Sequence, residues 1–379
     1  MRNSFSVGTK KFRVPAGFAA WRSCVINSVP SPYPVKVDQA GPAAQVAALL
    51  AENPGNVLLA DRRVWDLHLK GLKVDRSRVF LAPATENFKT QAGIFRVVDF
   101  LARRGFTKKE KLIVVGGGII EDVGAFVGAV YKRGIDWVYF PTTLLSMCDS
   151  CIGGKTGINY KKAKNQLALF SAPRAVVINP AYLGTLPYRH VLSGLGEALK
   201  LHITGGEGAF RNYAANVDAA LKVDLPALVR IIKGSLTIKR LVVEYDEFEQ
   251  DVRRSMNYGH TAGHALEVMS GYRISHGEAV TVGMIVANEL SRRMGLLSAA
   301  KAGLLEGGMM KLLAPGTRRE LARVRTGQLA ALLLKDKKTQ GKKANFALIE
   351  DLGRMRMVPV AIDASLCGAI SEILAEKFR

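Results

Sequence analysis

The first half of the chain alternates short apolar runs with stretches of helical apolar spacing. The apolar runs resemble buried strands of a parallel sheet, and they lie at residues 56–60, 78–82, 112–115, 137–140 and 176–178. Helical spacing covers residues 90–104 and 118–131, and the first stretch ends in a basic turn before Gly105. Because strands and helices alternate, the pattern predicts a parallel, Rossmann-like sheet.

The pattern changes after about residue 187, where long helical spacing dominates. It covers residues 191–203, 225–245, 255–270, 277–295 and 360–378, and the only strand-like run lies at 345–349. We therefore predict an α/β N-terminal Rossmann-like domain over residues 1–187 and a mostly α-helical C-terminal domain over 188–379. Residues 1–37 contain no Asp or Glu and several prolines, so we expect an irregular arm there.

Three glycines, Gly116 to Gly118, separate the apolar run at 112–115 from the following helix. Glycines at this place let the backbone approach a phosphate group at the helix N-terminus. A tight strand-to-helix turn would have the same residues. The position within a strand–helix unit favours dinucleotide binding.

A second glycine-rich segment runs from Asp149 through Gly153-Gly154-Lys155-Thr156 to Asn159. A phosphate-binding loop of the Walker A type would need glycine at position 149, so that motif is excluded. The segment still combines a carboxylate, a lysine and threonine hydroxyls, and Lys164-Asn165 follows closely. This set suits an anionic, hydroxylated ligand.

Five polar residues of the second half fall within an arc of about 80° if they belong to one helix. They are Glu249, Arg253, Asn257, His260 and His264. A solvated helix face is the alternative, and Gly259 or Gly263 could break the helix. His276 lies nearby in sequence, and two histidines with one carboxylate form a catalytic zinc set.

The chain has 54 Lys and Arg against 32 Asp and Glu, a formal charge of +22. This excess predicts an anionic partner. Aromatic residues make up only 7% and do not interleave with the basic ones, so a small anion is favoured over nucleic acid. No apolar stretch reaches 18 residues, which argues against a membrane span.

Four cysteines in 379 residues do not form a disulfide scaffold, and they favour a reducing, cytoplasmic location. Cys148 and Cys151 form a lone C-x-x-C, which could be a redox pair or half of a zinc site. We favour two small buried side chains.

Taken together, the motifs resemble the 3-dehydroquinate synthase family of sugar phosphate cyclases, in order over roughly residues 56–353. They lie at 116–122, 141–159, 164–165, 194–200, 253–267 and 276–279. The resemblance implies a homodimeric enzyme that binds NAD, a divalent metal (zinc or cobalt) and a small anionic sugar phosphate. Such enzymes oxidise a hydroxyl, eliminate phosphate, reduce the ketone again and close a carbocycle.

The resemblance also assigns roles to residues of this chain. The implied metal ligands are Glu197, His260 and His276. The implied phosphate contacts are His264, Asn257, Lys155 and Arg133, and Arg133 could reach the site of a partner subunit. Lys239 and Arg253 would hold a substrate carboxylate, whereas hydroxyl contacts or site shape would fall to Asp149, Lys200, Glu249 and Asn165. A late substrate lysine is either Lys337 or Lys338. The NAD contacts would be Gly117, Gly118, Asp122, Thr142, Thr143 and Lys164, with Asp61, Glu86 and Lys89 near the adenosine.

Retention of Asn257, His264, Lys239 and Arg253 favours conversion of 3-deoxy-arabino-heptulosonate 7-phosphate to 3-dehydroquinate. The chain departs from the family pattern at Glu121, Cys148, Cys151, Ala168, Tyr188 and Leu201-His202. Glu121 replaces a glycine and adds a negative charge near the pyrophosphate. These departures leave open a specialised cyclase of the amino-dehydroquinate or sedoheptulose 7-phosphate type. A metal-dependent alcohol dehydrogenase is less favoured, because the 149–159 segment and the Lys239/Arg253 pair would be superfluous for a simple alcohol.

Overall fold

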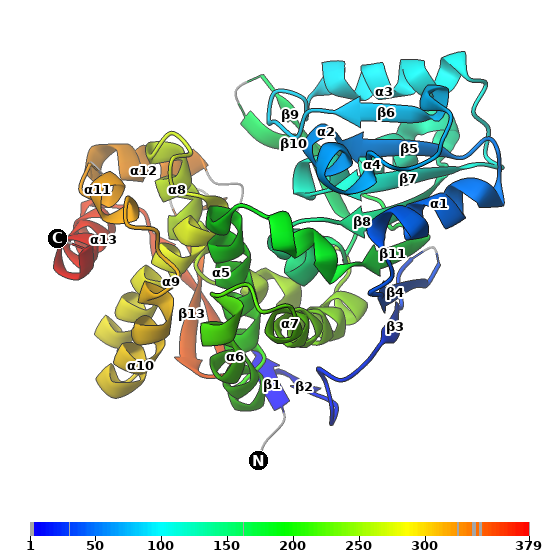
Figure 1. Cartoon of the computed structure of the whole chain (residues 1–379). Coiled ribbons are helices and arrows are strands. Elements are labelled where there is room, and N and C mark those ends of the chain that lie inside the picture. The colour runs from blue at the N-terminus through cyan, green and yellow to red at the C-terminus, as the bar shows by residue number, and fades with distance from the viewer. Residues whose placement is uncertain are drawn as a thin grey trace.

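The computed structural model describes residues 4–29, 31–161, 163–323, 326–335, 339–340 and 343–378. It has a lobe built on a seven-stranded sheet and a second, mainly helical lobe (Figure 1). The sheet has the order β3-β4-β11-β8-β7-β5-β6. Its strands are β3 (Ser23–Ile26), β4 (Tyr33–Val37), β11 (Ala175–Ile178), β8 (Asp136–Pro141), β7 (Lys111–Gly116), β5 (Val57–Asp61) and β6 (Val79–Ala82).

All neighbouring strands of this sheet are parallel except the edge pair β3–β4. The five strands predicted from the apolar runs are all present, and the parallel sheet is confirmed. The associated helices are α1 (Pro42–Glu52), the short α2 (Arg62–Val64), α3 (Gln91–Arg103) and α4 (Gly118–Val130). Because β7 and β8 pair in parallel, their carboxyl ends, Gly116 and Pro141, lie side by side.

The second lobe contains most of the helices (Figure 1). They are α5 (Tyr188–Thr204), α6 (Glu207–Ala220), α7 (Leu225–Tyr245), α8 (His260–Met269), α9 (His276–Arg293), α10 (Ala299–Met310), α11 (Thr317–Leu321), α12 (Thr326–Lys335) and α13 (Ala364–Phe378). Helix α9 is buried from Gly277 to Ser291 on every face, and it contacts α5, α8, α10, α13 and β13. The predicted α/β lobe followed by a mostly helical part is confirmed.

The prediction of an irregular arm over residues 1–37 is wrong. This region forms β1 (Ser4–Val7) and β2 (Lys10–Arg13) as well as β3 and β4. Strand β1 lies between β2 and β14 (Arg354–Ala361) in a five-stranded sheet and pairs in parallel with β14. The other two strands of this sheet are β13 (Lys343–Asp351) and β12 (Thr339–Gln340). Strand β2 pairs with β1 as a local hairpin, whereas β14 lies more than 300 residues away, so local sequence could not reveal that pairing. The division of the chain at residue 187 stays a prediction.

Two further elements differ from the sequence-based expectation. The glycine-rich segment after Asp149 continues into a hairpin, β9 (Lys155–Tyr160) with β10 (Ala163–Phe170). The helix predicted over 255–270 is interrupted: a 3₁₀ turn covers Val252–Asn257, and α8 begins only at His260. Within the part of the chain that the structure describes, no helix is long and apolar enough to cross a membrane.

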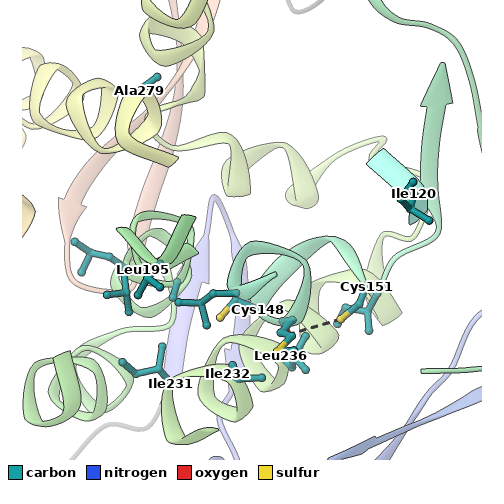
Figure 2. Packing of buried hydrophobic residues seen from close by; sticks show 14 of the residues in the cluster. Ile120, Cys148, Cys151, Leu195, Ile231, Ile232, Leu236 and Ala279 are labelled. Carbon is teal, nitrogen blue, oxygen red and sulfur yellow. Dashed lines mark hydrogen bonds between the residues drawn. The ribbon is translucent and has the colours of Figure 1, made fainter. Parts of the chain in front are cut away.

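The cysteines of the C-x-x-C motif are buried in the core, where the helical turn at Ser146–Ser150 packs against α5 and α7 (Figure 2). Cys148 lies near Leu195 and Ile232, and the Cys151 thiol lies 3.7 Å from the Met147 carbonyl. Both are free thiols, and burial raises both pKa values. The interpretation as two small buried side chains is therefore confirmed.

Candidate active site

Three histidines converge where α8 and α9 begin. Ring nitrogens of His260, His264 and His276 lie within 4.8 Å of one another. Gly259 precedes His260 with φ of +79°, and this left-handed turn aims the start of α8 toward α9. His276 is the first residue of α9 and lies within the capping box that Ser275 and Glu278 form. The sequence cluster is thus a spatial cluster.

Glu197 projects toward the same point from α5. Its Oε1 lies 3.3 Å from His276 Nε2 and 3.7 Å from His260 Nε2. The approach of the two helices depends on Gly277, where a Cβ atom would lie 1.8 Å from the Ser193 carbonyl oxygen. Gly196, beside Glu197, and Gly277, beside His276, therefore let helices α5 and α9 approach closely where the Glu197 and His276 side chains meet.

The Glu197 carboxylate is only 2% exposed, and neither oxygen receives a well-directed hydrogen bond from the described residues. Lys200 Nζ lies 2.7 Å from Oε2 as an ion partner. Burial opposes ionisation, but the charges of Lys200 and His276 keep the Glu197 pKa below its ordinary value. A buried carboxylate with free acceptor capacity beside imidazole nitrogens fits a divalent metal of the zinc type.

Sequence reasoning missed Glu267, which orients one of these histidines. Its Oε2 lies 3.0 Å from His276 Nδ1, on the side of the ring opposite Nε2. Burial acts against the charged form, yet His276 and Lys164 lower the Glu267 pKa to about 2. The signal was present: Glu267 follows His264 by three residues, so both share one face of α8.

A buried ion network lies beside the histidine cluster. Asp149 accepts from Lys200 Nζ at 2.8 Å, and Lys239 Nζ lies 2.5 Å from the other Asp149 oxygen. Lys239 also donates to the Asp149 carbonyl at 2.6 Å. Burial opposes its charge, but the two lysines hold the Asp149 pKa well below its ordinary value. Three elements, the 146–150 turn, α5 and α7, are joined here.

Two further cations, Lys155 and Arg253, lie where the β9–β10 hairpin begins. Lys155 pairs with Glu249, and Asn257 Nδ2 donates to Glu249 Oε1 at 2.9 Å. Arg253 is 3% exposed and donates to the Gly153 carbonyl at 3.1 Å. Burial, together with the nearby charge of Arg253, lowers the Lys155 pKa to about 8.

The prediction that the five polar residues lie on one continuous helix is wrong. Glu249 lies in a loop with φ of +56°, Arg253 in the 3₁₀ turn, and the two histidines on α8. The loop is shaped by Asp246, whose carboxylate accepts three backbone N–H bonds, from residues 250, 251 and 253. Gly259 broke the helix, but folding still brings these side chains to one region.

The turn at Gly116 to Gly118 links β7 to α4. At Gly117 a Cβ atom would lie 2.7 Å from Thr143 Cγ2, so only glycine leaves this surface open. Helix α4 starts at Gly118, and its free N–H groups suit a pyrophosphate. Thr142 and Thr143 come from the end of the neighbouring β8. This cradle fits a dinucleotide.

Charged residues continue from this turn toward α8. Asp122 pairs with the buried Lys89 and accepts from the Gly157 amide at 3.2 Å. Lys164, on β10, lies 3.0 Å from Glu86 Oε1 and 3.2 Å from Glu267 Oε1. Its Nζ also sits 3.9 Å from the Tyr272 ring centre. Lys164 therefore joins the sheet lobe to the element that orients His276.

Comparison with known proteins identifies the family of this chain. Sequence models of the 3-dehydroquinate synthase N-terminal and C-terminal domains match residues 79–193 and 194–339. A 3-dehydroquinate synthase of Dictyoglomus thermophilum is 36% identical over 300 residues, 78% of this chain and 82% of the relative. That of Geobacter metallireducens is 38% identical over 292 residues, 76% of this chain and 80% of the relative. The chain belongs to the 3-dehydroquinate synthase family. The predicted resemblance and the enzyme class, a phosphate-eliminating cyclase, are confirmed.

Solved structures related to this synthase-family chain share its fold. A 2-deoxy-scyllo-inosose synthase complexed with carbaglucose-6-phosphate, NAD⁺ and Co²⁺ matches with a TM-score of 0.78 at 21% identity, covering 93% of this chain and 99% of that one. A 2-epi-5-epi-valiolone synthase from Streptomyces hygroscopicus with NAD⁺ and Zn²⁺ matches at 0.75 and 25% identity, covering 94% and 100%. A probable glycerol dehydrogenase from Sinorhizobium meliloti reaches 0.59 at 18% identity, covering 90% and 96%.

Some predicted site residues of this synthase-family chain lie outside the cluster. Arg133 is exposed at the far end of α4, which spans about 20 Å from the glycine turn. Lys337 and Lys338 lie outside the described residues. Asp61 ends β5 and caps α2 by accepting from the Arg63 amide at 2.9 Å. Asn165 has φ of +52°, and its backbone N–H donates to Asn159 Oδ1 at 3.1 Å.

Proposed function

We propose that this chain converts 3-deoxy-arabino-heptulosonate 7-phosphate to 3-dehydroquinate with catalytic NAD and a divalent metal. The observation that carries the proposal is a set of three cations beside the histidine–Glu197 cluster. Lys155, Lys239 and Arg253 are close enough that the other two depress the Lys155 pKa by repulsion, in addition to the larger effect of burial. Such repulsion is relieved by a ligand with several negative charges, which a phosphate and a carboxylate on one sugar acid supply.

Each predicted residue then has a physical role. Glu197, His260 and His276 would hold the metal, with His264 close enough to contact either the metal or the phosphate. Lys155 and Asn257 would hold the phosphate, and Lys239 and Arg253 the carboxylate. Bound NAD would accept a hydride and return it, and the metal would polarise the reacting oxygen.

Asp149 and Lys200 are suited to orienting the substrate hydroxyls. Lys200 is 3% exposed and lies between two carboxylates, so its charge is fixed by Asp149 and Glu197. The network of Lys200 and Lys239 with Asp149 and Glu197 already balances two cations and two anions. Its fixed charges can therefore donate to and accept from substrate hydroxyls without leaving an isolated buried charge.

The departures from the family pattern bear on the alternative, a specialised cyclase. Cys148, Cys151 and His202 are buried in the core. His202 Nδ1 lies 3.4 Å from Ser235 Oγ, the hydroxyl that also lowers the Cys148 pKa against the larger effect of burial. Two of the departures thus meet at Ser235 behind the site, and Tyr188 is exposed at the start of α5. Because these side chains lie in the core or on the surface, their placement favours an unchanged substrate.

The experiment measures phosphate release from 3-deoxy-arabino-heptulosonate 7-phosphate with NAD⁺ and zinc or cobalt, with and without chelator. We expect chelator-sensitive turnover, formation of dehydroquinate and no net NADH. Stoichiometric NADH would indicate a dehydrogenase. Turnover of sedoheptulose 7-phosphate instead would favour the specialised cyclase. Glu197→Gln should abolish turnover, whereas Glu320→Gln, a carboxylate paired with Arg273 and Arg323, is the matched control.

We also propose a homodimer in which Arg133 reaches the site of the partner subunit. Its exposed position, remote from the cluster of its own chain, supports this arrangement. Mixing inactive Arg133→Ala protomers with inactive Glu197→Gln protomers should restore activity, because one site of each mixed dimer is then complete. Sedimentation gives the oligomeric state. A monomer, or a mixture without restored activity, would contradict this proposal.

A further inference from the structure

Glu121 is a buried carboxyl group to which the proposed mechanism gives no role. It lies in the first turn of α4, three residues after Gly118, and is 6% exposed. Ser150 Oγ donates a hydrogen bond to Glu121 Oε2 at 2.5 Å. Ser150 directly follows Asp149, the centre of the lysine network. One hydrogen bond therefore joins the helix that begins at the glycine turn to the segment that carries Asp149.

The glycine turn is held from two sides. From the β8 side, Tyr139 Oη donates to the Gly116 carbonyl at 3.1 Å, and the Thr142 amide donates to the same oxygen at 3.0 Å. On the other side, Ser150 Oγ lies 3.9 Å from the place of a Cβ atom on Gly118. Glu121 fixes the Ser150 hydroxyl there. The helix start that would receive a pyrophosphate is thus braced by β8 and by Ser150.

We propose that Glu121 is a positioning residue that ties the glycine turn to the Asp149 segment through Ser150, and that this tie sets the affinity of the turn for a dinucleotide. The inference rests on the proposed function, since it takes NAD as the ligand of the turn. Glu121 acts through Ser150 and the backbone rather than by touching the cofactor. Cofactor binding and the placement of Asp149 become linked by this contact.

The charge state of Glu121 follows from its surroundings. Burial raises its pKa to about 8, and the neighbouring Asp122 adds to the effect, while Ser150 and Lys239 oppose it. The titratable groups that face it are Asp122 of α4, Tyr139 of β8, Cys151 after the 146–150 turn, Lys239 of α7 and Tyr33 of β4. Tyr139, Cys151 and Tyr33 have raised pKa values and stay neutral near pH 8.

Glu121 is therefore mostly a neutral acid at pH 7. The expectation that it adds a negative charge near the pyrophosphate is wrong at this pH, because burial disfavours the anion. As pH rises through 8, the anion forms close to the helix start and opposes a pyrophosphate there. Affinity for NAD⁺ should then fall.

The test is calorimetric titration of NAD⁺ into the full chain at pH 7 and pH 9. In the wild-type protein we expect the Kd to rise up to about tenfold at pH 9, the loss expected when only the protonated form binds well. Glu121→Gln accepts the same bond from Ser150 without ionising, so its Kd should match the wild type at pH 7 and stay nearly constant. Glu121→Ala and Ser150→Ala should each weaken binding about tenfold at pH 7.

Lys155 also titrates near pH 8, so the readout is the difference between wild type and Glu121→Gln at each pH. Thermal melting checks folding, and if Glu121→Ala does not fold, Glu121→Gln and Ser150→Ala carry the test. An unchanged pH dependence in Glu121→Gln, or wild-type affinity in Ser150→Ala, would overturn the inference. Absence of NAD⁺ binding by the wild type would instead overturn the proposed function.

Discussion

Glu267 Oε2 and His276 Nδ1 lie 3.0 Å apart, and this contact fixes which nitrogen of His276 faces the site. With Nδ1 held by the carboxylate, Nε2 is turned toward Glu197, 3.3 Å from its Oε1. A carboxylate behind a metal-binding imidazole orients the ring and raises its basicity. Lys164 holds Glu267 in turn from β10, so the sheet lobe contributes to the orientation of a residue on α9.

Removal of Glu267 should weaken metal binding. We expect Glu267→Ala to lower zinc or cobalt affinity by about 10- to 100-fold, because His276 loses the partner that orients it. Competition with a chromophoric chelator measures the affinity directly, without reference to activity. The matched control is Glu320→Gln, a carboxylate of the same lobe that is paired with Arg273 and Arg323. Equal metal affinity in both variants would show that Glu267 does not orient the ligand.

Substrate affinity should fall as pH rises through about 8. The Lys155 ammonium loses its proton there, and the neutral amine attracts a phosphate less strongly. The apparent KM for the sugar phosphate should therefore increase from pH 7 to pH 9 while the reaction product stays the same. Lys155→Arg keeps its charge over this range, so its KM should change less. A wild-type KM that does not change with pH would contradict the assignment of Lys155.

Asp149→Asn should destabilise the folded chain strongly. The substitution leaves Lys200 and Lys239 buried with one fewer negative charge, and breaking a buried ion network typically costs about 3–5 kcal/mol. Urea unfolding at pH 7 measures the change in the free energy of unfolding. In the control, Asp218→Asn removes an exposed pair with Lys311 and should change stability by less than about 1 kcal/mol.

The same network gives stability a pH dependence. The folded-state pKa of Asp149 is depressed, so its contribution is present above the unfolded-state pKa and is lost as pH falls through the folded-state value. Acid should therefore destabilise the wild type more than Asp149→Asn. A constant difference in stability between the two proteins from pH 7 into acid would contradict the ion network.

Gly153→Ala should disturb both stability and substrate binding. Gly153 has φ of +92°, and a Cβ atom there would lie 2.4 Å from Arg253 Nη2. Backbone strain alone costs about 1–3 kcal/mol, and the methyl group would displace the Arg253 guanidinium. Urea unfolding and the KM for substrate report the two effects. Gly303→Ala, within α10 and in open space, should instead leave KM unchanged and stabilise by up to about 1 kcal/mol.

The sequence by itself predicted the alternating strands and helices of the sheet lobe and the short motifs of the candidate site. The apolar runs predicted five strands of the seven-stranded sheet, β11, β8, β7, β5 and the edge strand β6, because a strand largely covered by other elements must be apolar regardless of its partners. Helix α7 has the predicted bounds, Leu225–Tyr245, since an apolar stripe and a capping Asp224 are both local signals. The glycine turn at 116–118 and the histidines at 260, 264 and 276 were likewise visible as short motifs.

Only the tertiary structure decided how these groups act. Strands β1 and β14 pair across the length of the chain, which no local pattern encodes. The polar stripe gathers Glu249 with Asn257 through a loop shaped by Asp246 rather than through a helix. The charge of Glu121 depends on burial, and a pKa is set by the surroundings that folding assembles, not by the residue type alone.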